Sequence, residues 1–242
     1  MDYRILIAGD SAIALEFGNA IDPEVCTRAR AVRKTIEKAR IHGIKELVQT
    51  YTSVMVHYDP LLIGYDALLK KLKKVLDSVD LSLGADHKII MDIPVCYGGI
   101  YGPDMQTVCE HTGLSEEEVI RLHSEPDYQI YMMGFMPGFV YLGGMNPRLE
   151  TPRLSSPRPR LEAGSVGIAA KQTGMYPLAS PGGWQIIGRT PIKPYDPDRE
   201  KPILYESGEY LRFVPITPER FEEIRSLVEK DEYEYVWRKE DV

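Results

Sequence analysis

Residues 134–144 read GFMPGFVYLGG, and they suit neither a helix nor a central strand. Four glycines and one proline surround two phenylalanines and a tyrosine. Glycine and proline are the least favourable residues inside a helix, and proline inside a central strand removes a hydrogen bond from the ladder. We therefore predict a tight, broken loop at the rim of a β-structure, where the backbone holds the aromatic side chains in fixed positions.

The residues on either side of this stretch predict a β-rich fold. Between residues 127 and 215 glycine and proline recur every few residues, and the pieces between them are short and β-rich (YQIYMM, SVGIAA, GWQIIGRT, GEYLRFVPI). Short strands with frequent turns are typical of a β-barrel or a sandwich. Two short helices are expected before this region, the second with a capping box of Ser115 and Glu118. A further helix is expected from Thr217, and the charge-rich residues 229–242 suggest a surface helix.

Residues 3–79 follow a different pattern, with the order β-β-α-β-β-α. Residues 3–17 alternate around a Gly-Asp-Ser turn, and residues 44–59 contain two more β-rich runs. The helix between them can be capped by Asp22 and ended by Gly43. The second helix, in residues 64–79, has leucines on one side and lysines on the other. This order predicts a small antiparallel sheet covered by two helices.

The chain is therefore predicted to be an α+β protein of two domains. Residues 82–87, SLGADH, have the composition of a linker, and the texture of the sequence changes after them. We place an N-terminal α+β domain at residues 1–85 and a β-barrel domain with flanking helices at residues 86–242.

Composition and charge exclude several classes of protein. The 242 residues carry a net charge of −7, whereas a general nucleic-acid-binding protein needs a strong basic surface. No apolar run has the length of a membrane span, and the N-terminus has no signal-peptide pattern. Three cysteines (26, 96 and 109) without framework spacing suggest reduced thiols in a cytoplasmic protein.

Familiar catalytic motifs are missing from the sequence. It has no Walker-type or dinucleotide-binding glycine motif. The five histidines show no metal-ligand spacing, and Cys109 and His111 would point apart on a helix. We therefore expect no metal site formed by this chain alone.

Four segments within about 60 residues nevertheless combine rigid backbone with chemically useful side chains. They are residues 134–144, 147–160, 169–177 and 180–191. Prolines and glycines stiffen or sharply turn the chain there, and arginines can bind carboxylate or phosphate with two parallel hydrogen bonds. Taken singly, the aromatic residues could plug a barrel end, the arginines could be solvated, and Trp184 could be a core anchor. Taken together, the segments favour a binding site or a partner surface.

The longest motifs resemble a known family. IRLHSEPDYQIYMMGFMPGFVYLGGMNPRL (120–149) and SSPRPRLEAGSVGIAAKQTGMYPLASPGGWQIIGRTP (155–191) are similar to the two signatures of the B subunit of prokaryotic 5-oxoprolinase, and YTSVMVHYDP (51–60) agrees with its N-terminal pattern. The family is also described as allophanate hydrolase subunit 1 and as the Kip-type inhibitor of a histidine kinase. It resembles the carboxyltransferase portion of urea carboxylase.

This resemblance implies a cyclophilin-like β-barrel as the second domain and a hetero-oligomeric enzyme. The partners would be the C subunit, a related barrel protein, and the A subunit. The implied reaction is the ATP-dependent opening of 5-oxo-L-proline to L-glutamate. ATP, with Mg²⁺ as a possible companion, would bind at a surface shared with the C subunit.

The resemblance also implies two sets of site residues. Those expected to contact anionic groups and the reacting substrate are Arg153, Arg158, Lys171, Gln172 and Thr173. Those expected to line, orient or close the substrate pocket are Phe135, Pro137, Gly138, Tyr141, Tyr176, Pro181, Gly182, Gly183 and Trp184. The chain departs from the family pattern at three places. Leu154 and Lys171 stand where arginine is common, and Leu161-Glu162 replaces the more usual valine-proline.

Two other functions stay open at this point. A regulatory inhibitor of a sensor histidine kinase would expose an apolar patch on the barrel and would not depend on Lys171. A carboxyltransferase or allophanate hydrolase-like subunit would need a separate biotin carrier, because the chain has no Met-Lys biotin acceptor motif.

Overall fold

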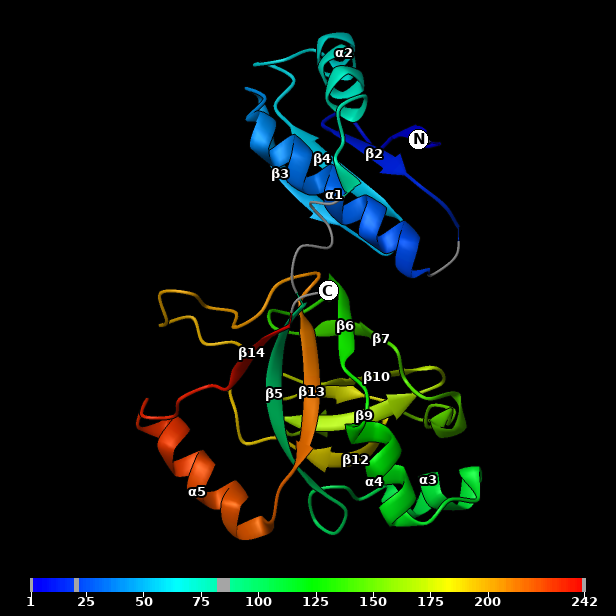
Figure 1. Ribbon diagram of the computed structural model, residues 1–242, viewed down its shortest axis with the longest axis vertical. Helices are drawn as coiled ribbons and strands as arrows, with labels where there is room; N and C mark the ends of the chain where they lie inside the picture. The colour runs from blue at the N-terminus through cyan, green and yellow to red at the C-terminus, as the bar shows by residue number, and fades with distance from the viewer. Residues whose placement is uncertain (1, 20–21, 82–87, 241–242) are drawn as a thin grey trace. The chain divides into compact units, whose positions relative to one another are not determined.

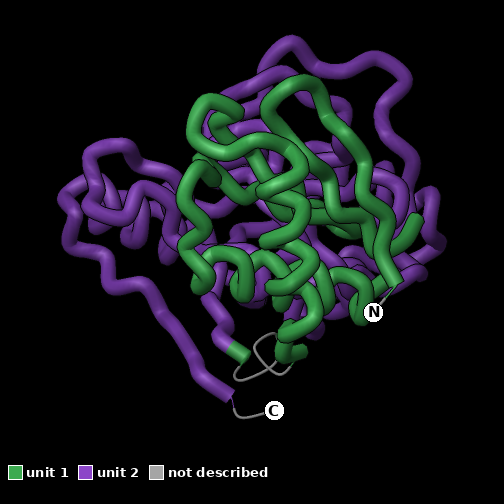
Figure 2. The backbone as a smooth tube through the Cα atoms, turned by 90° about the horizontal axis from the view of Figure 1, so that it is seen from above, with its two compact units in different colours: residues 1–88, 241–242 green, residues 89–240 purple. Residues whose placement is uncertain are grey.

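The computed structural model describes residues 2–19, 22–81 and 88–240, which form two compact units (Figure 2). Unit 1 consists mainly of residues 1–88 and unit 2 of residues 89–240. The predicted linker at 82–87, and with it the predicted boundary after residue 85, lies outside the described residues. In the part of the chain that is described, no helix is both long enough and apolar enough to cross a membrane.

Unit 1 has the predicted β-β-α-β-β-α order, which confirms that part of the fold (Figure 1). Its elements are β1 (Arg4–Ile7), β2 (Ala12–Glu16), α1 (Pro23–Ala39), β3 (Ile44–Gln49), β4 (Ser53–Tyr58) and α2 (Tyr65–Leu76). The four strands form an antiparallel sheet in the order β1-β2-β4-β3. Alternate residues of the central strands face the helices, which buries Ile13, Leu15, Val54 and Val56. Leu68 and Leu72 of α2 belong to the same buried cluster.

The start of helix α1 agrees with the sequence, but its end does not. The Asp22 carboxylate accepts hydrogen bonds from the backbone of Glu24 and Val25, as expected of an N-cap. The helix stops at Ala39 because Arg40 takes a left-handed conformation with φ 44°. Gly43 therefore lies in the turn to β3 and is not the helix cap that its position suggested.

Unit 2 is built mainly from short strands. Its elements are β5 (Lys88–Tyr97), α3 (Met105–Thr112), α4 (Glu116–Ser124), β6 (Tyr128–Met133), β7 (Val140–Gly143), the 3₁₀ helix η2 (Pro147–Leu149), β8 (Arg158–Leu161), β9 (Ser165–Ala169), β10 (Gln172–Met175), β11 (Ser180–Gly182), β12 (Gln185–Arg189), β13 (Tyr210–Pro215), α5 (Pro218–Glu229) and β14 (Trp237–Glu240).

The strands of unit 2 form a nearly closed barrel, which confirms the predicted β-barrel. They follow one another as β10-β9-β12-β5-β13-β6-β7, and β10 packs against β7 across the remaining gap. Val95, Tyr128, Val166 and Phe213 are among the side chains that fill the interior. The expected C-terminal surface helix is wrong, because β14 pairs with β5 and the backbone N–H of Asp92 donates to Val236. The strand begins at Trp237, and aromatic residues are favoured in sheets.

The hairpin between β6 and β7 contains the glycine- and proline-rich loop of residues 134–139. The backbone N–H of Phe139 donates to the carbonyl of Met136 at 2.9 Å, and that of Gly134 donates to the carbonyl of Phe139 at 2.8 Å. Pro137 and Gly138 are the central residues, and Gly138 has φ 78°. This is the pattern of a type II turn, in which proline suits the first central position and glycine the second.

Packing from other segments fixes this turn. The fully buried Tyr205 donates its hydroxyl proton to the Gly138 carbonyl at 2.6 Å. A β-carbon on Gly138 would lie 2.9 Å from the Cβ of Tyr195 and 3.2 Å from the Cβ of Pro177. Only glycine therefore satisfies both the backbone angle and the space at this position.

A buried polar chain joins β5, α4 and β10. Thr173 donates its hydroxyl proton to the carbonyl of Gly167 at 3.0 Å. His123 Nε2 therefore donates to the Thr173 oxygen at 2.7 Å, which leaves Nδ1 to accept from the Tyr97 hydroxyl at 2.7 Å. Burial lowers the pKa of His123 to about 3, so the imidazole stays neutral in the fold.

Replacing Gly138 with alanine should destabilise unit 2 by about 2–4 kcal/mol, because the variant combines left-handed strain with a steric clash. Gly99→Ala is the matched control, since Gly99 also has φ 51° but has open space around its missing side chain. It should cost only about 1 kcal/mol. Denaturant unfolding measures both values, and equal losses would show that the packing around Gly138 contributes nothing.

The neutral His123 should make the fold sensitive to acid. Its folded pKa lies below the ordinary unfolded value, so the unfolded chain takes up the proton first. The contribution of the neutral His123 to the free energy of unfolding is complete above about pH 6.5, and it is lost as the pH falls towards 3. Between pH 7 and 5 the free energy of unfolding should fall by about 2 kcal/mol from this group alone. His123→Gln should remove that slope, whereas His111→Gln, at an exposed position, should leave it intact.

Candidate functional site

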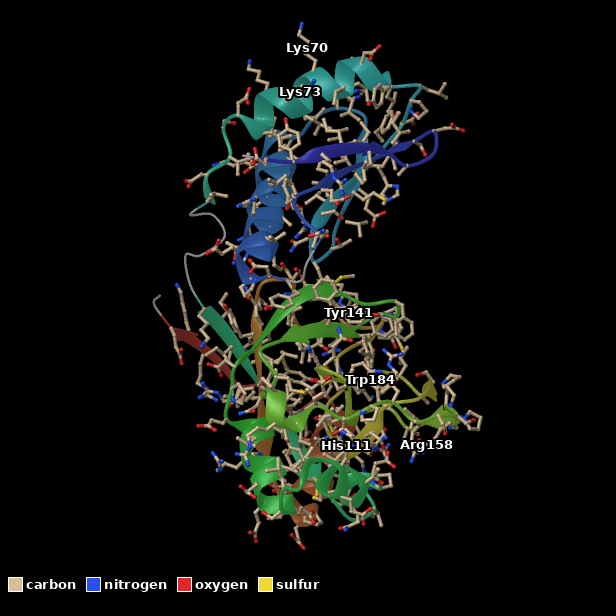
Figure 3. The ribbon with its side chains drawn as sticks, turned by 90° about the vertical axis from the view of Figure 1, so that its right-hand side faces the viewer. Lys70, Lys73, His111, Tyr141, Arg158 and Trp184 are labelled. Carbon is tan, nitrogen blue, oxygen red and sulfur yellow. The ribbon has the colours of Figure 1, made fainter. Side chains whose placement is uncertain are left out.

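Five aromatic side chains gather at the rim that carries the β6–β7 turn. Phe139 lies at the centre, with its ring 5.5 Å from Tyr141, 5.6 Å from Tyr176 and 5.7 Å from Trp184, all edge to face. Phe135 lies 5.1 Å from Phe139 on the outer side. We call these five residues the aromatic cluster. Figure 3 shows Trp184 between Tyr141 and Arg158 in unit 2.

Most of the cluster is packed interior. Phe139, Tyr176 and Trp184 are at most 4% exposed, and Tyr141 is half-buried. Phe135 is different, because 72% of it is exposed, and Pro137 beside it is also exposed. The predicted wall is thus a rigid aromatic block with one phenylalanine projecting from it.

Tyr176 combines a buried ring with a polar end. Burial raises its pKa to about 12, although the charge of Arg153 and a hydrogen bond from the Trp184 backbone act in the opposite direction. The hydroxyl therefore keeps its proton at physiological pH and remains a donor. Gly182 packs against it, since a β-carbon there would come within 2.6 Å of the Tyr176 oxygen.

The segment that carries Arg153 is held on both sides. The Ala170 backbone donates to the Thr151 carbonyl at 2.7 Å, and the Gln185 side chain donates to the Pro152 carbonyl at 3.0 Å. Leu154 in turn donates its N–H to Gly183 at 2.8 Å. Arg153 itself is exposed, and in the described chain its side chain has no ion-pair partner. Its guanidinium is thus free to bind an anion.

Lys171 occupies the two-residue turn between β9 and β10. Ala170, the other turn residue, has φ 50°, and the strands pair again at Ala169 and Gln172. Lys171 is exposed and, like Arg153, is in no ion pair in the described part of the chain. Because Thr151 bridges Ala170, the backbones that carry Arg153 and Lys171 run beside each other.

Arg158 has a different environment from Arg153. Its two terminal nitrogens bind the Asp104 carboxylate at 2.6 and 3.0 Å, and Asp104 also accepts the backbone N–H of Ile186 at 2.6 Å. The Asp104 side chain is 7% exposed and that of Arg158 is 33% exposed. This arginine is therefore largely used in joining β8 to the start of α3.

The remaining predicted residues are on or under the same rim. Pro181 and Gly182 belong to β11, which pairs with β8, and Gly183 follows them. Gln172 is half-buried, whereas Thr173 is 1% exposed and its hydroxyl is hydrogen-bonded to His123. The structure therefore brings Arg153, Lys171, Tyr176 and Trp184 to one rim, while Arg158 and Thr173 are engaged elsewhere.

Sequence reasoning missed two polar residues beside this rim. Asp104 lies directly before helix α3, and its bond to Arg158 spans 54 positions. Gln185 is 4% exposed, and its Oε1 has no hydrogen-bond partner among the described residues, although its side-chain nitrogen donates to the Pro152 carbonyl. No local pattern marks either residue, because their partners are distant in the sequence.

The free cations fit the charge of a nucleotide or of a substrate carboxylate. Arg153 can bind a phosphate or a carboxylate with two hydrogen bonds, and Lys171 adds a mobile positive charge. Over the described ranges, no group of three or more His, Cys, Asp or Glu side chains is placed to hold a metal ion.

Comparison with known proteins finds relatives over most of the chain. A family described as carboxyltransferase domain, subdomain C and D, matches residues 3–205. Two relatives are the 5-oxoprolinase B subunit of Bacillus subtilis (strain 168), 40% identical over 89% of this chain and 93% of the relative, and the 5-oxoprolinase B subunit of Escherichia coli O157:H7, 39% identical over 88% and 95%.

A solved structure supports the fold as well. The crystal structure of TTHA0988 superimposes with a TM-score of 0.76 at 36% identity, over 85% of this chain. The superposition covers 40% of that protein's length. From the extent of the family match and of its relatives, the chain belongs to the carboxyltransferase domain, subdomain C and D family, as its two long signatures predicted.

Proposed function

We propose that this chain is the B subunit of a multi-subunit 5-oxoprolinase. Together with the A and C subunits it would open 5-oxo-L-proline to L-glutamate at the expense of ATP. The observation that carries the proposal is that relatives named as the B subunit of 5-oxoprolinase match nearly the full length of the chain. The exposed Arg153 and Lys171 of the rim support the proposal, because such chemistry requires cationic side chains.

The chemistry of a lactam explains why cations are needed. Resonance stabilises its carbonyl, so water attacks the carbonyl carbon slowly. Phosphorylation of the carbonyl oxygen would make this carbon a better electrophile. ATP, when bound, would supply the phosphoryl group for this activation. Catalysis of phosphoryl transfer consists mostly of positioning and charge stabilisation. In this proposal Arg153 and Lys171 bind the anionic groups of substrate and nucleotide.

In this proposal the predicted residues have two kinds of role, direct contact with the substrate and indirect support. Tyr176 keeps a hydrogen-bond donor beside Arg153, and Gln172 lies next to Lys171, so both are suited to orient the substrate. Arg158 and Thr173 would act indirectly, because their polar atoms already bind Asp104 and His123. They hold the strands that carry the contact residues.

The outer end of the aromatic cluster is suited to a partner. Phe135 and Pro137 are exposed on a turn that Gly138 and Tyr205 hold in place. An exposed aromatic side chain on a fixed backbone loses little entropy on binding. We propose that this end packs against the C subunit, which would complete the pocket and the nucleotide site.

The same exposed phenylalanine favours one alternative. A regulatory protein that inhibits a sensor histidine kinase would also use an apolar projection on the barrel. Binding to a kinase dimerisation helix pair that depends on Phe135 but not on Lys171, in a chain that supports no oxoprolinase activity, would favour this function.

Removing the free cations should impair turnover of the assembled enzyme. Arg153→Ala and Lys171→Ala should each lower kcat/KM for 5-oxoproline at least tenfold, because each removes a charge contact of about 1.5–3 kcal/mol. Glutamate formation in the complex reconstituted from all three subunits is the measurement. Lys193→Ala, at another exposed lysine of unit 2, is the control and should remain fully active. Unchanged turnover in both site variants would disprove the assignment.

Truncating the exposed phenylalanine should weaken assembly. With Phe135→Ala, the Kd for the C subunit should rise about 10- to 30-fold, as expected for an interface anchor of about 2 kcal/mol. Titration calorimetry measures this constant. Ile100→Ala, which alters a residue of unit 2 that is 89% exposed, is the control. If the two variants bind equally well, Phe135 is not part of the contact.

A further inference from the structure

Helix α2 of unit 1 carries a concentrated positive charge that the proposed reaction does not use. Lys70, Lys71, Lys73 and Lys74 lie within five consecutive residues, and all are exposed. In the described part of the chain none of them is in an ion pair or a side-chain hydrogen bond. We call these four residues the lysine face.

Several surface cations of the other helices form ion pairs along their helix. Arg33 binds Glu37 in α1, and Arg121 binds Glu125 at the end of α4. Both arginines of α5 likewise bind glutamates three or four residues away. Asp66 and Asp77 stand four residues from Lys70 and Lys73, yet neither pair is formed. Helix α2 thus keeps four clustered lysines without an ion pair in the described chain, whereas the cations of α1 that form none there, Arg28 and Lys38, stand ten positions apart.

The fold fixes the direction of these charges. Leu68 and Leu72 are fully buried and Leu76 is 5% exposed, so α2 cannot rotate about its axis. Side chains three residues apart lie side by side on a helix, which places two adjacent lysine pairs on the opposite side. Figure 3 shows Lys70 and Lys73 extending from α2 away from the rest of unit 1.

The distribution of charge along the chain indicates the partner's chemistry. Residues 1–88 hold 13 basic and 12 acidic side chains, while residues 89–242 hold 16 basic and 24 acidic ones. Nucleic acid is a poor match, because the whole chain carries −7 and the lysine face has no arginine or exposed aromatic to read a base. A membrane-surface helix needs a free apolar face, and that of α2 is buried.

We propose that the lysine face is a docking surface for a partner protein with an acidic contact region. The inference rests on the proposed function, since the partner belongs to the same multi-subunit enzyme. Lysine is a strongly hydrated, flexible charge, so it contributes mainly to the rate of encounter. The lysine face would therefore steer association at a surface separate from the aromatic cluster.

The test compares two double variants with the same change in charge. Lys70→Glu/Lys73→Glu alters the lysine face, and Lys230→Glu/Lys239→Glu alters two other exposed lysines. Association and dissociation rates with the purified A and C subunits are measured separately by surface plasmon resonance at 50, 150 and 500 mM NaCl. Circular dichroism and thermal unfolding establish that both variants fold.

For one of these two partners, the lysine-face variant should associate at least tenfold more slowly at 50 mM salt, with a dissociation rate within twofold of wild type. The salt dependence should flatten, and the control variant should change less than twofold. Equal slowing by both variants, or no slowing by either, would overturn the inference while complex formation still supports the proposed function. Failure of the unaltered chain to bind either partner would overturn both. Binding of wild type, but not of the variant, to anionic vesicles or duplex DNA, with assembly of the enzyme unaffected, would also refute an acidic protein partner.

Discussion

The type II turn at Gly138 is the constraint on which the aromatic rim of the barrel depends. A residue with a side chain would meet Tyr195 and Pro177 there, and Tyr205 holds the carbonyl from the other side. This turn sets the direction in which Phe135 leaves the barrel and the position of Phe139 beneath it. Because Phe139 touches the other four rings of the aromatic cluster, one backbone conformation positions the whole aromatic block.

Buried polar groups perform a second kind of positioning around this block. The Asp104 carboxylate ties β8 to α3, and the neutral His123 ties β10 to α4 and β5. Groups of this kind are costly to bury unless every partner is present. Their satisfied hydrogen bonds therefore specify one arrangement of the strands, and the exposed cations at Arg153 and Lys171 stand on that arrangement. A free cation on a fixed support is suited to bind an anion that arrives from solution or from a partner.

The two units have different chemical characters. Unit 2 combines a net negative sequence with a rim of free cations and a projecting phenylalanine, which together suit a site completed by another chain. Unit 1 has a small sheet against which two helices pack, and one of these helices, α2, carries four lysines that form no ion pair within the described ranges. In the proposed assembly, each of these two surfaces would recognise a different partner.

The sequence by itself determined the order of the elements of unit 1, the helix caps at Asp22 and Ser115, the broken turn at residues 134–139 and the family. These features depend on residues a few positions apart, and periodicity and turn chemistry report such local relations directly. Only the tertiary structure decided which arginine is free, because Arg158 meets Asp104 across 54 positions while Arg153 meets no acid in the described chain. It also decided that Thr173 is buried and that the last described residues form a strand beside β5. Those outcomes depend on contacts between distant segments, and no local pattern encodes which distant partner a side chain will reach.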